Sequence, residues 1–214
     1  MKYTHIIWDW NGTLLNDVSW CMQQINIMLK KRRLPVLDSL QAYHCVFGFP
    51  VKDYYRRVGF DFEKESFEIL AAEFIELYHN NENALLFPAA KEILSEFQQK
   101  GIHQIILSAS ELGNLLSQMK PFDIASFFDE ILGISDIFAT SKIDLGKAYI
   151  QQTNPEKAVL VGDTIHDKEV ADELGVDCIL IANGHQSKKD LSSCDSVVVD
   201  CLIDIMSVLE SETI

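Results

Sequence analysis

Hydrophobic residues along the chain follow two alternating patterns, one typical of buried strands and one typical of amphipathic helices. Apolar runs of strand length occur at residues 5–9, 102–107, 130–133, 158–161, 178–181 and 197–199. Helical spacing follows or separates them over about 89–100, 111–119, 123–127, 142–153, 168–174 and 202–209. Apolar strands that alternate with helices are typical of a parallel sheet covered on both faces. We therefore predict an α/β fold with a Rossmann-like parallel sheet at its core.

One long segment departs from this alternation. From Asp17 to about Asn83 the pattern is helical throughout and contains no convincing strand. The apolar spacing predicts about four helices, which begin near residues 18, 39, 50 and 65. We therefore predict an all-α insert at residues 16–84, within a core made of residues 1–15 and 85–214.

Net charge and cysteine content limit the classes of binding partner and the cellular compartment that we expect. The 214 residues carry a net charge of −14, and an acidic surface repels nucleic acid and anionic membranes, so we expect neither as a partner. The five cysteines include no C-x-x-C pair, which favours reduced thiols in a cytoplasmic protein over a disulfide framework. No long apolar segment follows the first strand, so we expect neither a signal peptide nor a membrane span.

Polar residues follow or adjoin several of the predicted strands. They are Asp9, Ser108, Lys142, Asp163 and Asp167. Because the carboxyl ends of parallel strands meet at one edge of a sheet, we expect these side chains to converge on one crevice. Three carboxylates repel each other unless a cation lies among them, and oxygen ligands select a hard ion such as Mg²⁺. A hydroxyl and a lysine beside that ion suit a phosphoryl group, with Asp9 as the nucleophile.

Four motifs together resemble the haloacid dehalogenase superfamily of phosphohydrolases, in its phosphoglycolate-phosphatase-like branch with a helical cap. The family's Asp-x-Asp-Gly-Thr motif is matched by residues 9–13, Asp-Trp-Asn-Gly-Thr, except at one position. Its apolar strand ending in Ser or Thr is matched by residues 105–108, and its Gly-Asp-x-x-x-Asp motif is matched in full by residues 162–167. Its lysine is best matched by Lys142, with Lys147 one turn later as the alternative.

The resemblance implies a role for each matched residue. Asp9 attacks phosphorus and becomes an aspartyl phosphate, with Asn11 and Lys142 as the other catalytic positions. The Mg²⁺ ligands implied are Asp9, the backbone carbonyl of Asn11, Asp163 and Asp167. The substrate-binding residues implied are Trp10, Gly12, Thr13, Ser108, Ala109 and Lys142. The substrate class implied is a small phosphorylated metabolite.

Asn11 is the position at which the chain departs from the family pattern. The phosphatases of this family carry an aspartate there, which protonates the leaving group and then activates water, and an asparagine can do neither. General acid–base catalysis contributes roughly 10²–10⁴-fold, so its loss predicts a slow phosphatase rather than an inactive one. Three outcomes stay open: good leaving groups still react, the phosphoaspartate persists, or His166 or a cap residue replaces the acid. The alternative functions are a non-catalytic binder of a phosphorylated ligand and a mutase-like phosphotransfer protein.

Two other branches of the superfamily also lack an acid at this position. The haloacid dehalogenases need no metal, and the pair of Asp163 and Asp167 argues against that branch. The phosphonatases use a Schiff-base lysine from the cap, and the lysines at positions 30, 31 and 52 of the insert leave that interpretation open.

Overall fold

A computed structural model describes residues 2–79, 84–134 and 141–210, and its centre is a six-stranded sheet. The strands are β1 (His5–Trp8), β2 (His103–Glu111), β3 (Glu130–Ile134), β4 (Ala158–Gly162), β5 (Asp177–Ile181) and β6 (Val197–Val199). Their order is β3-β2-β1-β4-β5-β6, and each neighbouring pair is parallel. This confirms the predicted α/β fold with a Rossmann-like sheet. The order reverses between β1 and β4, which is where such sheets open a crevice at their carboxyl edge.

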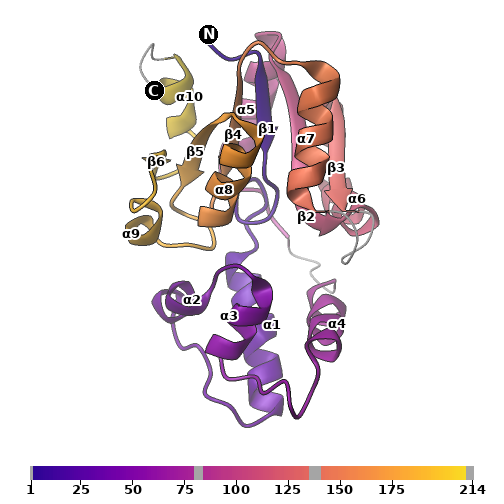
Figure 1. The fold of residues 1–214 in the computed structure, drawn as a ribbon, viewed down its shortest axis with the longest axis vertical. Coiled ribbons are helices and arrows are strands. Elements are labelled where there is room, and N and C mark those ends of the chain that lie inside the picture. Colours follow the sequence, from indigo (N-terminus) through magenta and orange to yellow (C-terminus); the bar gives the residue numbers. More distant parts are fainter. Residues whose placement is uncertain (1, 80–83, 135–140, 211–214) are drawn as a thin grey trace.

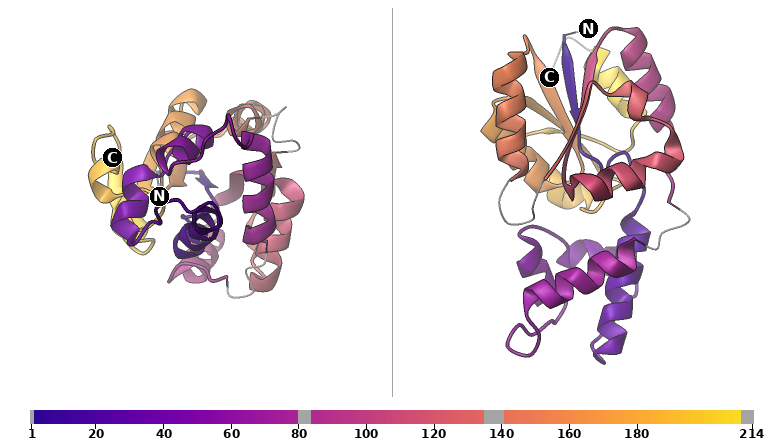
Figure 2. Two further views of the ribbon diagram at one scale, coloured as in Figure 1. Left: turned by 90° about the horizontal axis from the view of Figure 1, so that it is seen from below. Right: turned by 90° about the vertical axis from the view of Figure 1, so that its right-hand side faces the viewer.

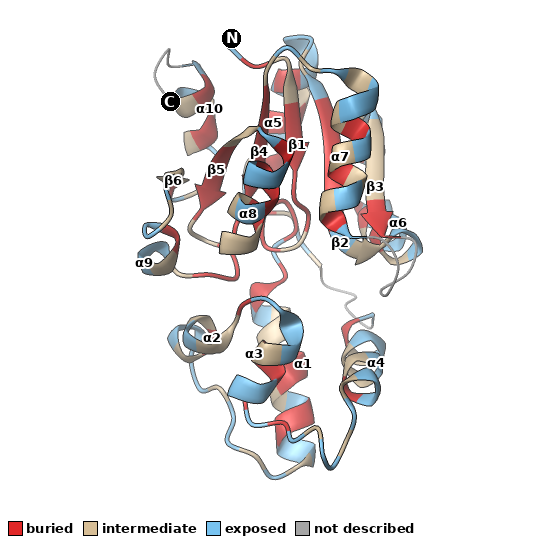
Figure 3. Ribbon diagram, in the orientation of Figure 1, coloured by how far each residue is buried: buried red, intermediate tan, exposed pale blue. Residues whose placement is uncertain are grey.

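Helices cover both faces of the sheet because alternate strand residues point to opposite sides. Ile6 and Trp8 pack with one hydrophobic cluster, whereas Ile7 packs with the other. The helices on the first face are α5 (Ala90–Gln99), α6 (Leu112–Met119) and α10 (Asp204–Glu210). Those on the second face are α7 (Lys142–Thr153), α8 (Ile165–Leu174) and α9 (Lys188–Leu191). Figure 2 shows the two helical layers on either side of the strands, and Figure 3 shows that the buried residues concentrate between them.

Four further helices form a separate layer below the carboxyl ends of the strands (Figure 1). They are α1 (Val18–Lys31), α2 (Leu40–Val46), α3 (Val51–Arg57) and α4 (Phe67–Tyr78). This layer has its own core, in which Ile25, Met28 and Leu29 of α1 pack against aromatic residues such as Tyr55. The observed helices are consistent with the predicted all-α insert, and residues 80–83, just before its predicted end, lie outside the described residues.

The chain enters and leaves the helical layer at one place. The N–H group of Asn16 donates to the carbonyl of Leu85 at 2.9 Å, and the N–H group of Phe87 donates to the carbonyl of Leu14 at 2.9 Å. An antiparallel bridge between Leu15 and Leu86 lies between these two hydrogen bonds. The two crossings therefore form a short paired ribbon.

Several boundaries differ from those that apolar spacing predicts. Helix α8 begins at Ile165 rather than Lys168, because Thr164 and Asp167 form a capping box that starts the helix earlier. Strand β2 continues to Glu111, with a register shift against β3 after Leu107. The short helix α9 was not predicted, and 3₁₀ turns at Lys120–Phe122 and Ala125–Phe127 replace the helix predicted over 123–127. Within the described ranges no helix has both the length and the apolar character needed to cross a bilayer.

Candidate active site

Asp9 stands directly after β1, at the carboxyl edge of the sheet. Its N–H group donates to the carbonyl of Val161 on β4 at 2.9 Å, and its side chain is buried. The chain then turns through Gly12, whose φ of 76° is strained for any residue with a side chain. A Cβ atom at Gly12 would also overlap the side chains of Asp163 and His185. The turn therefore needs glycine, both for its conformation and for this close approach.

Lys142, at the start of α7, joins two of the predicted acids. Its Nζ atom donates to Oδ1 of Asp9 and, at 2.6 Å, to Oδ1 of Asp167, and all three side chains are buried. Burial opposes a charge on Lys142, but Asp167 and Asp9 raise its pKa above the usual range. Lys147 lies on the surface, where it pairs with Glu173 at 2.6 Å. Of the two lysines that the sequence offers, the structure brings Lys142 to Asp9.

Asp163 is the third acid of the same cluster, and Asp167 has a further donor besides Lys142. Asp163 accepts hydrogen bonds from the Thr13 hydroxyl at 3.2 Å and from the backbone N–H of His185. Asp167 accepts from the Thr164 hydroxyl at 2.6 Å as well as from Lys142. One oxygen from each of Asp9, Asp163 and Asp167 lies within 4.8 Å of the others.

Burial and crowding shift the pKa values of these acids in different directions. Burial raises the pKa of Asp9 to about 6, although Lys142 acts against it. Burial, opposed by His185 and reinforced by the neighbouring acids, raises the pKa of Asp163 to about 8. Burial also acts on Asp167, but there Lys142 and Thr164 lower the pKa below its usual range. Asp9 and Asp163 are thus carboxyls for which the protein supplies too little positive charge.

The remaining predicted residues lie around this cluster. The Ser108 side chain is buried at the edge of the sheet, and its Oγ accepts from the backbone N–H of Ser110 at 3.1 Å. Ala109, between them, is exposed. The Trp10 indole is fully buried and donates to Gln118 at 2.8 Å, so only its backbone borders the crevice.

Asn11 belongs to a second polar cluster, which joins the loop after β1 to the helical layer. Its Nδ2 atom donates to Oδ2 of Asp17 and to the hydroxyl of Tyr78, both at 2.9 Å. Its Oδ1 atom accepts from the Ser110 hydroxyl at 3.0 Å. Asp17 also accepts from the backbone N–H of Gly12 at 2.9 Å and from the Tyr78 hydroxyl at 2.7 Å.

His185 completes the second cluster from the loop after β5. Its Nε2 atom lies 3.3 Å from Oδ1 of Asp17, and its Nδ1 atom lies 2.8 Å from the hydroxyl of Tyr43 on α2. Burial disfavours the charged ring, but Asp17 raises the pKa of His185 to about 9. Its ring stacks on Phe47, with centroids 4.7 Å apart. His166, by contrast, contacts Glu169 and stacks on Phe49 of the helical layer.

Sequence reasoning missed Asp17, Tyr78 and His185 as members of the site. In the sequence, Asp17 reads as the start of a helix, but its side chain makes no capping hydrogen bond to α1 and instead points back to the loop. Tyr78 and His185 carry no motif, and only the fold brings them to Asn11 and Asp17. The detectable signal in the sequence is an amide at position 11 followed by an acid at position 17.

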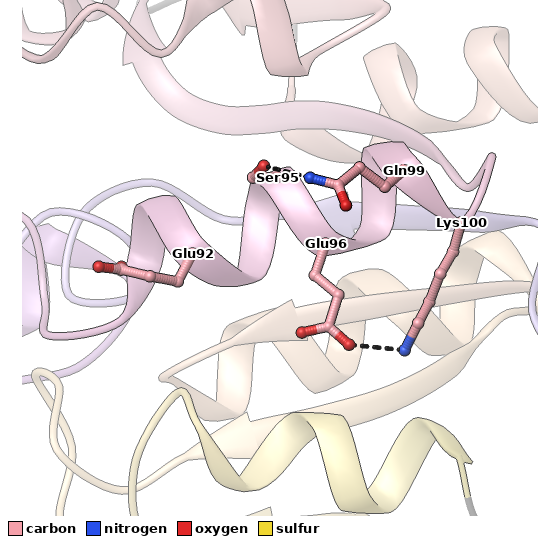
Figure 4. A pocket seen from close by; sticks show the side chains of 5 residues that line it. All are labelled: Glu92, Ser95, Glu96, Gln99 and Lys100. Atoms are coloured by element: carbon pink, nitrogen blue, oxygen red, sulfur yellow. Dashed lines mark hydrogen bonds and ion pairs between the residues drawn. The ribbon is translucent and has the colours of Figure 1, made fainter.

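Two hollows lie elsewhere on the surface. A cleft of about 1350 Å³ separates α2 and α3 from α8 and α9, and its lining includes Phe49, Arg57 and His166. A shallower hollow of about 490 Å³ runs along α5 (Figure 4), where Glu96 pairs with Lys100 at 2.7 Å. In the second hollow Gln99 donates to Ser95 and Lys100 pairs with Glu96 along one helix face, and the acids described above are not part of its lining.

Comparisons with known proteins agree with this arrangement. Residues 6–181 match the family model described as haloacid dehalogenase-like hydrolase. The chain is 25% identical to the tyrosine-protein kinase PtkA of Mycobacterium tuberculosis, over 91% of this chain and 67% of that protein. It is 22% identical to a phosphoglycolate phosphatase of Caulobacter vibrioides, over 94% of this chain and 88% of that one. Its fold is similar to that of the haloacid dehalogenase-like family protein SP0104 of Streptococcus pneumoniae, with a TM-score of 0.82, 22% identity, and 98% and 99% of the two chains covered.

Proposed function

The chain belongs to the haloacid dehalogenase-like hydrolases, and on that premise we propose that it hydrolyses the phosphate monoester of a small metabolite. The observation that carries this proposal is the buried group of Asp9, Lys142 and Asp167 at the carboxyl edge of the sheet. A lysine held against an under-paired carboxylate suits a transferring phosphoryl group, because its charge offsets that of the phosphoryl oxygens. The relatives named phosphoglycolate phosphatase support the same reaction class.

The proposed reaction has two displacement steps at phosphorus. In the first, an oxygen of Asp9 forms a bond to phosphorus while the ester P–O bond breaks; the leaving oxygen takes the electron pair and departs as an alkoxide or phenolate, which solvent water protonates. In the second, water forms a bond to phosphorus while the bond to Asp9 breaks, which releases inorganic phosphate and restores the carboxylate. Lys142 and the hydroxyl of Ser108 bind the phosphoryl oxygens, together with the backbone N–H groups of Trp10 and Asn11.

The donor set around Asp9 fits Mg²⁺. One oxygen from each of Asp9, Asp163 and Asp167 lies within 4.8 Å of the others, and hard oxygen donors are those that Mg²⁺ prefers. The pKa values of Asp9 and Asp163 are raised because the positive groups nearby do not fully offset the effect of burial on the two carboxylates. A bound cation would supply the missing positive charge. We assign as ligands Asp9, the Asn11 carbonyl and Asp163, with Asp167 as ligand or as acceptor for metal-bound water; the ion would offset the charge of the phosphoryl oxygens.

Two further assignments belong to this proposal. Residues 16–84 act as a cap that excludes water from the crevice, and residues 1–15 and 85–214 form the catalytic core. The separate hydrophobic core of α1 to α4 supports that division. We also assign the protein to the cytoplasm, which its five unpaired cysteines support.

The test is release of phosphate from a panel of aryl, acyl and sugar phosphates, with Mg²⁺ and with EDTA. Because Asn11 cannot protonate a leaving group, we expect aryl and acyl phosphates to react faster than sugar phosphates, and only with Mg²⁺. The Asp9→Asn variant controls for contaminating phosphatases. Equal release by this variant, or no release from any substrate, would contradict the proposal.

Phosphotransfer is the second candidate, and Asn11 is the observation that favours it. Without an acid/base group at this position the phosphoaspartate is opened slowly by water, which leaves time for another acceptor to take the phosphoryl group. Acid-quenched labelling of Asp9 by a phosphoryl donor distinguishes the two functions, since only the phosphotransfer protein accumulates label at steady state without releasing phosphate.

A further inference from the structure

We propose that Asp17 is a positioning residue of this site, and that it forms with Asn11 a reciprocal carboxylate–amide pair that holds the loop after β1 against helix α4. The part of this inference that concerns turnover rests on the function proposed above, whereas the part that concerns stability does not. It concerns a residue outside the four motifs, and it gives the asparagine at position 11 a physical reason.

The hydrogen bonds between Asn11, Asp17 and Tyr78 require one neutral amide and one carboxylate at positions 11 and 17. The Asn11 amide nitrogen donates to Oδ2 of Asp17 and to the Tyr78 hydroxyl, and these two acceptors are themselves hydrogen-bonded. Tyr78 accepts from Asn11 and donates to Asp17, so its single proton is also committed. The remaining Asp17 oxygen accepts from the Gly12 N–H group and faces His185. One amide and one carboxylate thus satisfy every group of the pair.

A carboxylate at both positions does not fit. An aspartate at position 11 would place an oxygen where the Nδ2 atom now lies, 2.9 Å from Oδ2 of Asp17. Asp17 is 1% exposed, so water cannot screen two like charges there. Restoring the family's aspartate at position 11 alone therefore disturbs the loop that carries the catalytic group, and the gain expected from an added acid is masked.

An exchange of the two residues does fit. With aspartate at 11 and asparagine at 17, the new amide donates to position 11 and its carbonyl accepts from the Gly12 N–H group. Tyr78 and Ser110 then both donate to the carboxylate at position 11. The exchange keeps a single negative charge and leaves each of these amide and hydroxyl donors with an acceptor. It removes only the weak acceptor of the Cys21 thiol, which now contacts Oδ2 of Asp17. It also moves the carboxylate to the position that the family's phosphatases use.

Through this pair Asp17 connects the catalytic loop to the helical layer. Gly12 and Asn11 lie in the loop that begins at Asp9, whereas Tyr78 is the last residue of α4. A small displacement of a reacting group lowers the rate steeply, because the alignment of nucleophile and phosphorus is lost. Asp17 therefore affects turnover by positioning the loop, without contact to substrate.

The experiment is a double-variant cycle with Asn11→Asp, Asp17→Asn and the exchange of both. Melting temperature is measured in EDTA, and kcat and KM for an aryl phosphate are measured with Mg²⁺. Each single variant should melt at least about 4 °C below the wild type, and the exchange within about 2 °C of it. Asp17→Asn should lower kcat roughly tenfold or more with little change in KM, and the exchange should restore or exceed the wild-type kcat.

Asp177→Asn is the matched control. Asp177 also accepts from a tyrosine hydroxyl, that of Tyr3 at 2.6 Å, but it begins β5 at the opposite edge of the sheet. This variant should lose stability and keep its kcat within about twofold of the wild type. If Asp17→Asn is too unstable to assay, Tyr78→Phe replaces it, since it removes only the hydroxyl that bridges the pair.

A wild-type melting temperature for Asn11→Asp, a wild-type kcat for Asp17→Asn, or an exchange no better than the weaker single variant would each overturn the inference. If the melting temperatures of the four proteins follow the expected pattern but none of them releases phosphate from any substrate, the reciprocal pair is supported and the proposed function is contradicted.

Discussion

Two buried carboxylates near the end of the first strand, Asp9 and Asp17, have opposite electrostatic character. Asp9 has one cationic partner, Lys142, which it shares with Asp167, and its pKa is raised to about 6. Asp17 is buried as deeply, and burial acts to raise its pKa, yet His185, Tyr78 and Asn11 lower that pKa below its usual range. Burial therefore does not decide the direction of the pKa shift here. The donors around each carboxylate do, and Asp17 has more of them than Asp9.

The largest effect that this comparison predicts is at Asp9. Asp9→Asn removes the nucleophile, so release of nitrophenolate from an aryl phosphate should fall roughly 10⁴-fold or more. Because an under-paired buried carboxylate is removed, the melting temperature in EDTA should stay the same or rise. A variant that keeps a tenth of the wild-type rate would show that Asp9 is no more committed to the chemistry than Asp17 is.

Lys142→Met should give the next largest effect. Loss of the cation that binds phosphoryl oxygens should lower kcat for an aryl phosphate by about 10²–10³-fold. Lys147→Met is the control, since that lysine side chain is 43% exposed and pairs with Glu173 on the surface, and its kcat should stay within about twofold. Equal losses in the two variants would contradict the assignment of Lys142.

The dependence of stability on pH separates the two regions in the metal-free protein. Asp9 and Asp163, with pKa values of about 6 and 8, hold protons in the folded protein that the unfolded chain releases near pH 4. The unfolded state thus binds fewer protons, so the free energy of unfolding falls as pH rises from about 4 through 8. His185 acts in the same direction between about pH 6.5 and 9, whereas the lowered pKa of Asp17 matters only below about pH 4.

In EDTA the melting temperature should therefore be at least about 4 °C lower at pH 8.5 than at pH 5, as measured by calorimetry. Mg²⁺ should raise the melting temperature more at pH 8.5, where the acids are ionised, than at pH 5. Asp163→Asn should flatten both dependences. A melting temperature that rises with pH in EDTA would show that these carboxyls are already ionised and adequately paired without metal.

The smallest expected effect is that of Tyr43→Phe. The variant removes one hydroxyl, which contacts Nδ1 of His185 from helix α2, and leaves the ring in place. Loss of one buried hydrogen bond costs about 1 kcal/mol, or a melting temperature about 3 °C lower. Because Asp17 keeps its other donors, kcat should change less than about threefold. A larger loss of kcat would extend the positioning role from Asp17 to α2.

The fold was predictable because its signals are local. Apolar runs such as residues 158–161 and helical spacing over residues 142–153 reflect which side chains are buried, and the parallel sheet then follows from the alternation of strands and helices. Boundaries were less accurate where side chains start a helix early, as Thr164 and Asp167 do for α8.

The site was predictable only in part, for a related reason. Asp9, Lys142 and Asp163 follow strands or begin helices, so topology alone brings them to one edge. Tyr78 and His185 reach Asn11 and Asp17 through the docking of the helical layer, and no periodicity in the sequence encodes that docking. The predicted roles of the motif residues remain predictions, although the geometry of Asp9, Lys142 and Asp163 is consistent with them.

The paired ribbon formed by residues 14–16 and 85–87 makes the helical layer modular. The two backbone segments that lead into and out of the layer run side by side, joined by hydrogen bonds and a bridge between Leu15 and Leu86. The segment between the two crossings is therefore connected to the sheet in the same way as a single hairpin loop. The backbone of such a junction accepts a loop of different length, and a replacement that keeps Asp17 and Tyr78 also keeps their hydrogen bonds to the loop after β1.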